Sequence, residues 1–196
     1  MKLDTKTHKR EFGGARMISK FENDLIECCE SAASFLREKH RKYNDEAGLE
    51  GNDRLYSGER EFVAELYRLL IEKDISNRDK LFFEAIRPDK GEISGKLIPD
   101  LVYRNGTHEK CVMEVKAPVN NRADGSELPW KRDSEDIEGD YEKLKDNYDQ
   151  FDTKYLIVAY LGDPVIKGGK EFPLEDFEKW VHSEFPDKGK IKVIVC

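Results

Sequence analysis

The sequence predicts a single α/β (α+β) domain in which helices pack around a central sheet, and three observations lead to this prediction. Four segments repeat their apolar residues at helical spacing, and they are interspersed with short runs rich in β-branched and aromatic residues. The chain has 196 residues, which suits one domain with a substantial core. No internal repeat or low-complexity stretch divides it.

The composition describes an acidic chain. Charged residues make up 38% of the sequence, and the formal net charge is −7. An overall basic charge, the usual feature of a strong nucleic-acid binder, is absent; this counts against tight unaided binding to DNA but leaves room for a local basic face. No apolar run approaches the ~18 residues of a membrane span, and the N-terminus lacks the apolar core of a secretory signal. We therefore expect a cytoplasmic protein without membrane contact, its four cysteines reduced.

The first half of the chain is predicted to be mainly helical. Residues 1–15 are expected to form a loose arm, and apolar residues at steps of three and four predict a helix over 16–44. Basic residues gather near the end of this helix, where they either complement the helix dipole or form a DNA-facing surface; both interpretations stay open. A loop over 45–56 leads to a second helix over 58–72, with Ser57 as its expected N-cap.

The remaining elements follow from the same two spacings. Runs of apolar β-formers predict strands at 81–86, 97–103, 110–115, 155–161 and 191–195, the last of them at a sheet edge. Helical spacing predicts helices over 140–151 and 174–185. The second and third strands are predicted to form a hairpin, because Asn105-Gly106 lies between them and readily adopts the positive φ of hairpin turns. A long irregular segment is expected over 118–138.

Three ionisable residues interrupt the apolar hairpin: Asp100, Glu114 and Lys116. Side chains two apart in a strand share a face, so Glu114 and Lys116 point the same way, with Asp100 on the neighbouring strand within cross-strand reach. Burying two carboxylates and an ammonium group together is unfavourable unless something compensates. A divalent cation on the two acids would compensate. The simpler interpretation is a turn acid beside an exposed ion pair on an edge strand.

The arrangement Pro99-Asp100 followed by Glu114-Val115-Lys116 resembles the PD-(D/E)xK nuclease superfamily, and it matches each position of that motif in order. The thirteen residues between the two acids are enough for a single hairpin. The resemblance implies a restriction-endonuclease-like core with the element order αβββαβ, built as a central mixed sheet flanked by helices.

This resemblance also divides the single domain of residues 1–196. The nuclease-like core is expected over 57–160. Residues 1–50 form an N-terminal arm and helix outside that core, and residues 161–196 add a C-terminal helix and strand.

Glu59 is the candidate third acid. On a helical wheel it projects into the apolar face of the second helix, between Leu66 and Leu70. Stabilisation at the positive end of the helix dipole is the simpler explanation of an acid at this position. The string S-G-E-R-E-F that contains Glu59 resembles the first-helix motif of the superfamily, which favours a metal-directed role, with Glu65 as the alternative third acid.

These residues predict a metal-dependent phosphodiesterase. The carboxylates of Glu59, Asp100 and Glu114 form an all-oxygen donor set, which selects Mg²⁺ or Mn²⁺ over Zn²⁺. The resemblance implies that the Val115 carbonyl also binds the metal, that Lys116 orients the attacking water or stabilises the transition state, and that the product carries a 5′ phosphate. The expected activity is that of a DNA endonuclease in restriction, repair or recombination. The alternative is a nucleic-acid-binding or assembly module on the same fold, with weak or no activity.

Contacts to the substrate are predicted from the segments that follow the motif. Lys131 and Arg132 are expected to bind phosphate while Trp130 stacks on a base, although a solvent-exposed loop explains these residues equally well. Lys143 lies in a D-x-x-K-L run that resembles the helix after the E-x-K strand in related families, where the lysine faces the active site or the backbone; an ordinary solvent-exposed helical lysine is the simpler interpretation. DNA is the expected partner, RNA is not excluded, and a homodimer is compatible with double-strand cleavage.

Overall fold

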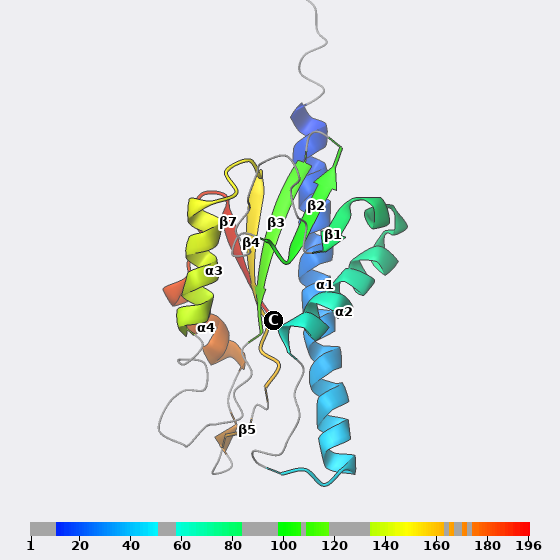
Figure 1. The fold of residues 1–196 in the computed structure, drawn as a ribbon, viewed down its shortest axis with the longest axis vertical. Helices are drawn as coiled ribbons and strands as arrows, with labels where there is room; N and C mark the ends of the chain where they lie inside the picture. The colour runs from blue at the N-terminus through cyan, green and yellow to red at the C-terminus, as the bar shows by residue number, and fades with distance from the viewer. Residues whose placement is uncertain are drawn as a thin grey trace, which may run out of the picture.

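The structure is a computed structural model of the chain. It describes the residues 11–50, 58–83, 98–106, 109–117, 134–162, 165–166, 170–171 and 174–196. The predicted fold class is confirmed: N-terminal helices precede a five-stranded mixed sheet with helices interspersed (Figure 1). None of the described helices is both long and apolar enough to cross a membrane.

The elements follow one another in the order that the sequence predicts, with shifted boundaries. The helices are α1 (Glu11–Glu46), α2 (Glu59–Lys73), a short 3₁₀ helix η2 (Ile75–Asp79), α3 (Ser134–Asp146) and α4 (Leu174–Glu184). The strands are β1 (Leu81–Phe83), β2 (Leu101–Asn105), β3 (Glu109–Lys116), β4 (Thr153–Val158), β5 (Val165–Ile166), β6 (Lys170–Glu171) and β7 (Ile191–Val195). From α2 to β4 the helices and sheet strands run α, β, β, β, α, β, which is the predicted core order.

The main sheet has the strand order β1-β2-β3-β4-β7, so β3 is its central strand and β7 lies at an edge as predicted. The strands β1, β2 and β3 are antiparallel neighbours, whereas β4 and β7 are added in parallel. Parallel neighbours need a crossover connection. The helix α3 lies in the connection from β3 to β4, and α4 lies in the connection from β4 to β7.

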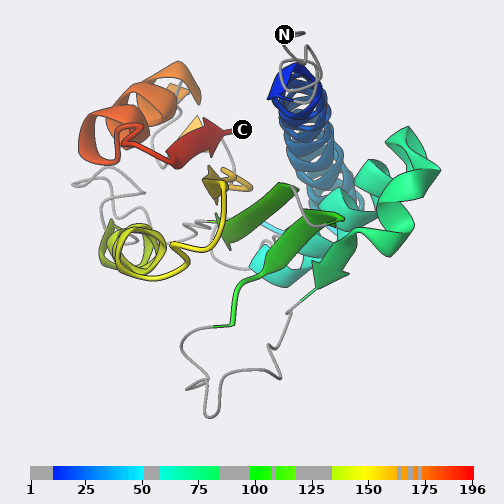
Figure 2. The ribbon, with the colours of Figure 1, turned by 90° about the horizontal axis from the view of Figure 1, so that it is seen from above.

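Helices cover both faces of this sheet (Figures 1 and 2). One apolar cluster joins α1 and α2 to the face that carries Leu101, Met113 and Val115. The other joins α3 and α4 to the face that carries Val112 and Leu156. The alternation of buried residues along β3 therefore assigns each of its side chains to one of two helical layers.

The long helix α1 corrects two predictions. It begins at Glu11, so residues 11–15 are helical although they were expected in a loose arm; a glycine pair weakens a helix by only about 1 kcal/mol per residue and does not have to end it. It ends at Glu46, so the basic residues do not lie in its last turn and do not complement its dipole there. One of them, Arg37, instead donates a hydrogen bond to the carbonyl of Tyr160 at 2.8 Å.

Other boundaries were also predicted wrongly. Gly58, rather than Ser57, is the N-cap residue of α2, and it makes no side-chain capping bond. The helix α3 spans Ser134–Asp146 rather than 140–151, and Tyr148 just beyond it adopts a positive φ of 63°, which is incompatible with continuing the helix. The small β5–β6 hairpin was not predicted, because two-residue strands carry no readable period.

Candidate functional site

The predicted acids and lysine lie where the C-terminal end of β3 meets the start of α2 and the inner face of α3. Glu114 and Lys116 share the face of β3 that turns toward α3, as predicted from their spacing, since both contact side chains of that helix. Val115, between them, points the other way into the cluster under α1 and α2. The period of two in β3 therefore supplies two functional groups and one core residue from three consecutive positions.

Asp100 lies immediately before β2 rather than within it, which corrects its predicted place on the strand. The last antiparallel pair of the hairpin joins Leu101 to Met113. Beyond that pair, a side chain replaces the next backbone acceptor of the ladder. Oδ2 of Asp100 accepts a hydrogen bond from the Val115 amide at 2.7 Å. The acid is thus held beside the motif by the backbone of the motif itself.

The backbone N–H of Val115 points toward Asp100, on the β2 side of β3. The next carbonyl, that of Lys116, accepts a hydrogen bond from Ala159 at 2.8 Å and so faces the opposite neighbour. In a strand, successive peptide groups alternate between the two neighbours, and the N–H and C=O of one residue point to the same one. The Val115 carbonyl therefore turns toward the acids, as its proposed metal-binding role requires.

Glu59 is the acid that α2 brings to this position. It is the first residue of the helix, and its Oε2 lies 3.2 Å from Nζ of Lys116. The alternative acid, Glu65, is engaged elsewhere: its two carboxylate oxygens bind Arg68 at 2.6 and 3.0 Å. Of the two candidates, the structure brings only Glu59 to the lysine of the motif.

Lys116 contacts a second carboxylate that the sequence analysis missed. Oδ2 of Asp140, on α3, lies 3.1 Å from its Nζ. Asp140 precedes Lys143 by three positions, and residues at that spacing share one face of a helix. The expectation that Lys143 faces the site therefore contained a signal for Asp140 as well.

Two donors from α3 and the turn after it hold Glu114. Nζ of Lys143 lies 2.8 Å from Oε1 of Glu114 and 3.0 Å from the carbonyl of Ile98, which confirms that this lysine faces the site. The hydroxyl of Tyr148 donates to the same Oε1 at 3.0 Å. Tyr148 was not predicted as a site residue, and its positive φ costs on the order of 1–3 kcal/mol for a residue with a side chain.

Burial dominates the electrostatics of the two acids of the motif. Glu114 is 2% exposed, and burial raises its pKa from 4.5 to about 8; Lys143 opposes this increase, and the charge of Asp100 adds to it. Burial likewise raises the pKa of Asp100 to about 6, opposed by the Val115 amide and strengthened by the charge of Glu59. Titratable groups with such raised pKa values are concentrated in functional sites.

Lys116 is shifted in the direction that keeps it charged. Burial alone lowers its pKa, but the neighbouring carboxylates of Asp140 and Glu59 outweigh burial and raise the pKa above the ordinary lysine value. The side chain is therefore an ammonium ion throughout the physiological pH range.

The donor set fits a hard divalent cation by its chemistry. Four carboxylates (Glu59, Asp100, Glu114 and Asp140) face two ammonium groups (Lys116 and Lys143), so the cluster carries an excess of negative charge once its acids are ionised. In the present arrangement, no group of three or more Asp, Glu, His or Cys side chains within the described ranges lies close enough together to hold a metal ion. Lys116 contacts Glu59 and Asp140, and Lys143 contacts Glu114, so the two ammonium groups lie beside the carboxylates that would bind a cation. Trp130, Lys131 and Arg132 lie outside the described residues.

Comparison with known proteins gives no match: no family model, curated protein or solved structure resembles this chain closely enough to identify it.

Proposed function

We propose that this protein is a metal-dependent phosphodiesterase that cleaves DNA, with the chemistry of a restriction, repair or recombination endonuclease. One observation carries the proposal: the four residues predicted from the motif, Glu59, Asp100, Glu114 and Lys116, come from three separate segments and gather at one end of β3. Its resemblance to the PD-(D/E)xK superfamily supports the same conclusion, because the core order α2-β1-β2-β3-α3-β4 accompanies the motif.

The carboxylates of Glu59, Asp100 and Glu114 and the carbonyl of Val115 would hold Mg²⁺ or Mn²⁺. When bound, the ion would polarise the scissile phosphate and lower the pKa of a bound water. Two of these acids are well prepared to bind a cation, because Asp100 is fixed by a backbone amide and Glu114 by Lys143 and Tyr148. Glu59 contacts Lys116 through Oε2, so its carboxylate would have to turn, or to use its other oxygen, to join them.

Lys116 acts in this scheme as a fixed positive charge. Asp140 holds its ammonium group from the α3 side, so the lysine would keep an anchoring partner if Glu59 turned toward the ion. A protonated lysine cannot accept the proton of the attacking water, but it binds phosphate oxygens and stabilises the negative charge that develops on them.

The experiment compares the parent chain with the near-isosteric variants Asp100→Asn and Lys116→Met. Cleavage of plasmid DNA, branched DNA and single-stranded RNA is followed with Mg²⁺ and with EDTA. We expect the parent to cut DNA only with the metal, and each variant to lose at least about a hundredfold in rate. Lys145→Met is the matched control, because Lys145 lies on α3 but pairs with Glu142 at the surface.

Three outcomes would contradict the proposal. An inactive parent on all substrates with Mg²⁺ would remove the enzymatic assignment, and undiminished cleavage by either variant would remove the site assignment. Cleavage of RNA alone would retain the chemistry and change the substrate.

One observation favours the alternative of a non-catalytic nucleic-acid-binding module. Lysines already contact the site acids, with Lys116 between Glu59 and Asp140 and Lys143 on Glu114, so the cluster is partly neutralised without a metal. Under this alternative, the parent would shift DNA in a gel without cutting it. Asp100→Asn would then bind DNA as well as the parent does.

A further inference from the structure

Lys154 is a buried lysine whose contacts the proposed chemistry does not use. It is 3% exposed, and its ammonium group donates to the carbonyls of Leu144 at 2.6 Å and Asn147 at 2.8 Å, with Asp149 at 3.3 Å. All three acceptors belong to the last turn of α3 or to the turn that follows. A buried ammonium group requires such a set of partners, so its position in β4 dictates where this part of the chain lies.

The turn after α3 is fixed from several other directions. The Asn147 side chain and amide both donate to the Lys143 carbonyl at 3.1 Å, which closes the helix. The Phe151 amide donates to the Tyr148 carbonyl at 2.9 Å, and Lys190 donates to the carbonyls of Asp149 and Phe151 at 3.1 and 3.0 Å. The positive φ of Tyr148 thus lies in a segment whose backbone is held on both sides.

The pairing of β3 with β4 places the two residues that hold this turn, Lys154 and Glu114, close together in the sheet. Lys154 pairs with Val112, and Glu114 pairs with Leu156, so Lys154 and Glu114 lie on neighbouring strands one diagonal step apart. Both side chains point to the α3 side. Lys154 binds the residues on either side of Tyr148, and Glu114 binds the hydroxyl of Tyr148 itself.

We propose that Tyr148 is a positioning residue of the site: Lys154 holds the turn in a conformation that aims the Tyr148 hydroxyl at Glu114 and thereby fixes the orientation of its carboxylate. Both donors to Glu114, Lys143 and Tyr148, bind Oε1. With Oε1 held by these two donors, Oε2 is the carboxylate oxygen that would bind a cation. The strained backbone of Tyr148 supports this role, because strain of this kind persists where a side chain must be held in one place.

The role of Tyr148 in metal binding rests on the proposed function, whereas its hydrogen bond to Glu114 does not. Two measurements test these two parts of the proposal separately. The first is the affinity for Mn²⁺, measured by calorimetry on the full chain and on Tyr148→Phe. Residues that orient a metal ligand typically contribute 10–100-fold to affinity, so we expect Tyr148→Phe to bind Mn²⁺ at least about tenfold more weakly.

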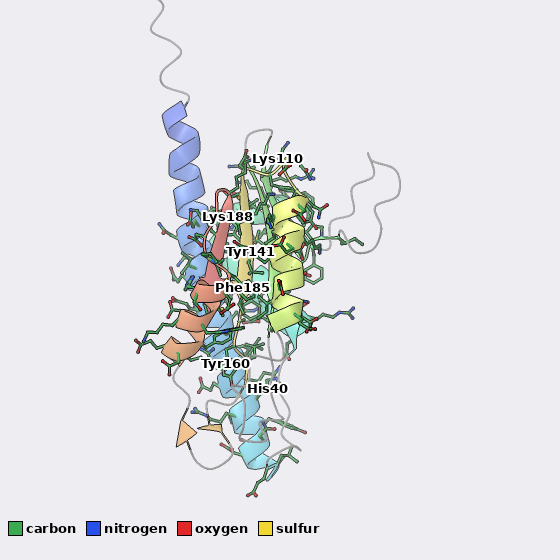
Figure 3. The ribbon with its side chains drawn as sticks, turned by 90° about the vertical axis from the view of Figure 1, so that its left-hand side faces the viewer. His40, Lys110, Tyr141, Tyr160, Phe185 and Lys188 are labelled. Atoms are coloured by element: carbon green, nitrogen blue, oxygen red, sulfur yellow. The ribbon has the colours of Figure 1, made fainter. Side chains whose placement is uncertain are left out.

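Tyr141→Phe is the matched control. Tyr141 lies on α3, ahead of the turn that carries Tyr148, but its hydroxyl donates to the carbonyl of Pro186 at 2.8 Å, and its ring packs beside Phe185 (Figure 3). Its replacement removes the same chemical group from a nearby part of the chain without touching the site acids. We expect Tyr141→Phe to bind Mn²⁺ as the parent does.

The second measurement is a urea-unfolding cycle in two backgrounds, with Glu114 and with Glu114→Leu. Where Glu114 is present, Tyr148→Phe removes a hydrogen bond and lowers the urea midpoint. In Glu114→Leu, the hydroxyl has lost this acceptor, so Tyr148→Phe leaves the midpoint unchanged or raises it. This difference between the two backgrounds does not depend on any metal or nucleic acid.

Each result decides one part of the proposal. Equal losses of midpoint in both backgrounds would show that Tyr148 does not hold Glu114, and an unchanged Mn²⁺ affinity in Tyr148→Phe would show that its hold has no bearing on the site. If the parent binds no Mn²⁺, the proposed metal site and the metal-binding role of Tyr148 both fail, while the unfolding cycle still decides whether the hydroxyl orients Glu114.

Discussion

The buried carboxylate of Glu114 makes the stability of this protein depend on pH in an unusual direction. The pKa of Glu114 is raised on folding, from 4.5 to about 8, so the folded chain binds a proton more tightly than the unfolded chain does. The stability that comes from this proton is fully present below pH 4.5 and is lost progressively as the pH rises through about 8. The substitution Glu114→Gln removes this dependence, because glutamine is neutral at every pH and has nearly the same shape as protonated glutamate.

The size of the effect follows from the same shift. One pKa unit corresponds to about 1.4 kcal/mol, so the increase from 4.5 to about 8 sets an upper bound on the order of 5 kcal/mol on the destabilisation above pH 8. Water that reaches the ionised group reduces this penalty, and we expect Glu114→Gln to be more stable than the parent by about 2–4 kcal/mol at pH 9. Near pH 5 we expect the two proteins to be equally stable.

The assay is urea unfolding of both proteins between pH 5 and 9, with and without Mg²⁺. The free energy of unfolding of Glu114→Gln should exceed that of the parent by an amount that grows as the pH rises. Mg²⁺ should reduce this difference, because it stabilises only the parent. Parallel curves, or a variant that is less stable at every pH, would refute the reasoning. Either result would mean that Glu114 is already ionised in the folded chain and that Lys143 compensates its burial.

Two further predictions concern the scaffold. Gly106 adopts a positive φ of 67° in the hairpin turn, with open space where a Cβ would lie, so Gly106→Ala should lower the free energy of unfolding by about 1 kcal/mol from backbone strain alone; an unchanged urea midpoint would show that the turn relaxes. Phe62, on α2, is fully buried in the cluster that α1 and α2 form with the sheet, so Phe62→Ala should cost about 3–5 kcal/mol in urea unfolding. Its control, Phe35→Ala, changes a side chain that is 51% exposed, and a similar loss there would argue against the assigned core.

Local periodicity predicted the type and order of the main elements because each buries one face against the sheet or against a helix. The boundaries failed where distant contacts decide them. Asn147 closes the last turn of α3 locally, but the place where the chain leaves the helix also depends on Lys154, from the next strand, which binds the carbonyls of Leu144 and Asn147 just before the chain turns at Tyr148. A helix boundary that depends on a side chain in another element has only part of its signal in the local sequence.

The residues of the candidate site also fall into those that local spacing predicted and those that depend on distant contacts. Glu114 and Lys116 were readable because two positions of one strand share a face, and Glu59 because a helical wheel placed it on the core side. Asp140 and Tyr148 were missed because their roles depend on how α3 crosses the sheet above β3, and that crossing is set by packing in the cluster that contains Val112 and Leu156.

The missed residues change the interpretation of the motif. Acids and lysine alone describe a place where a cation binds, but the described contacts add a carboxylate that anchors Lys116 and a phenol that anchors Glu114. A chain under selection for stability alone would replace a buried, ionisable cluster with apolar residues at little or no loss. Here the cluster persists with raised pKa values at Asp100 and Glu114 and a strained tyrosine beside it. Because each of these features opposes folding, their concentration at one end of β3 supports a function for the site.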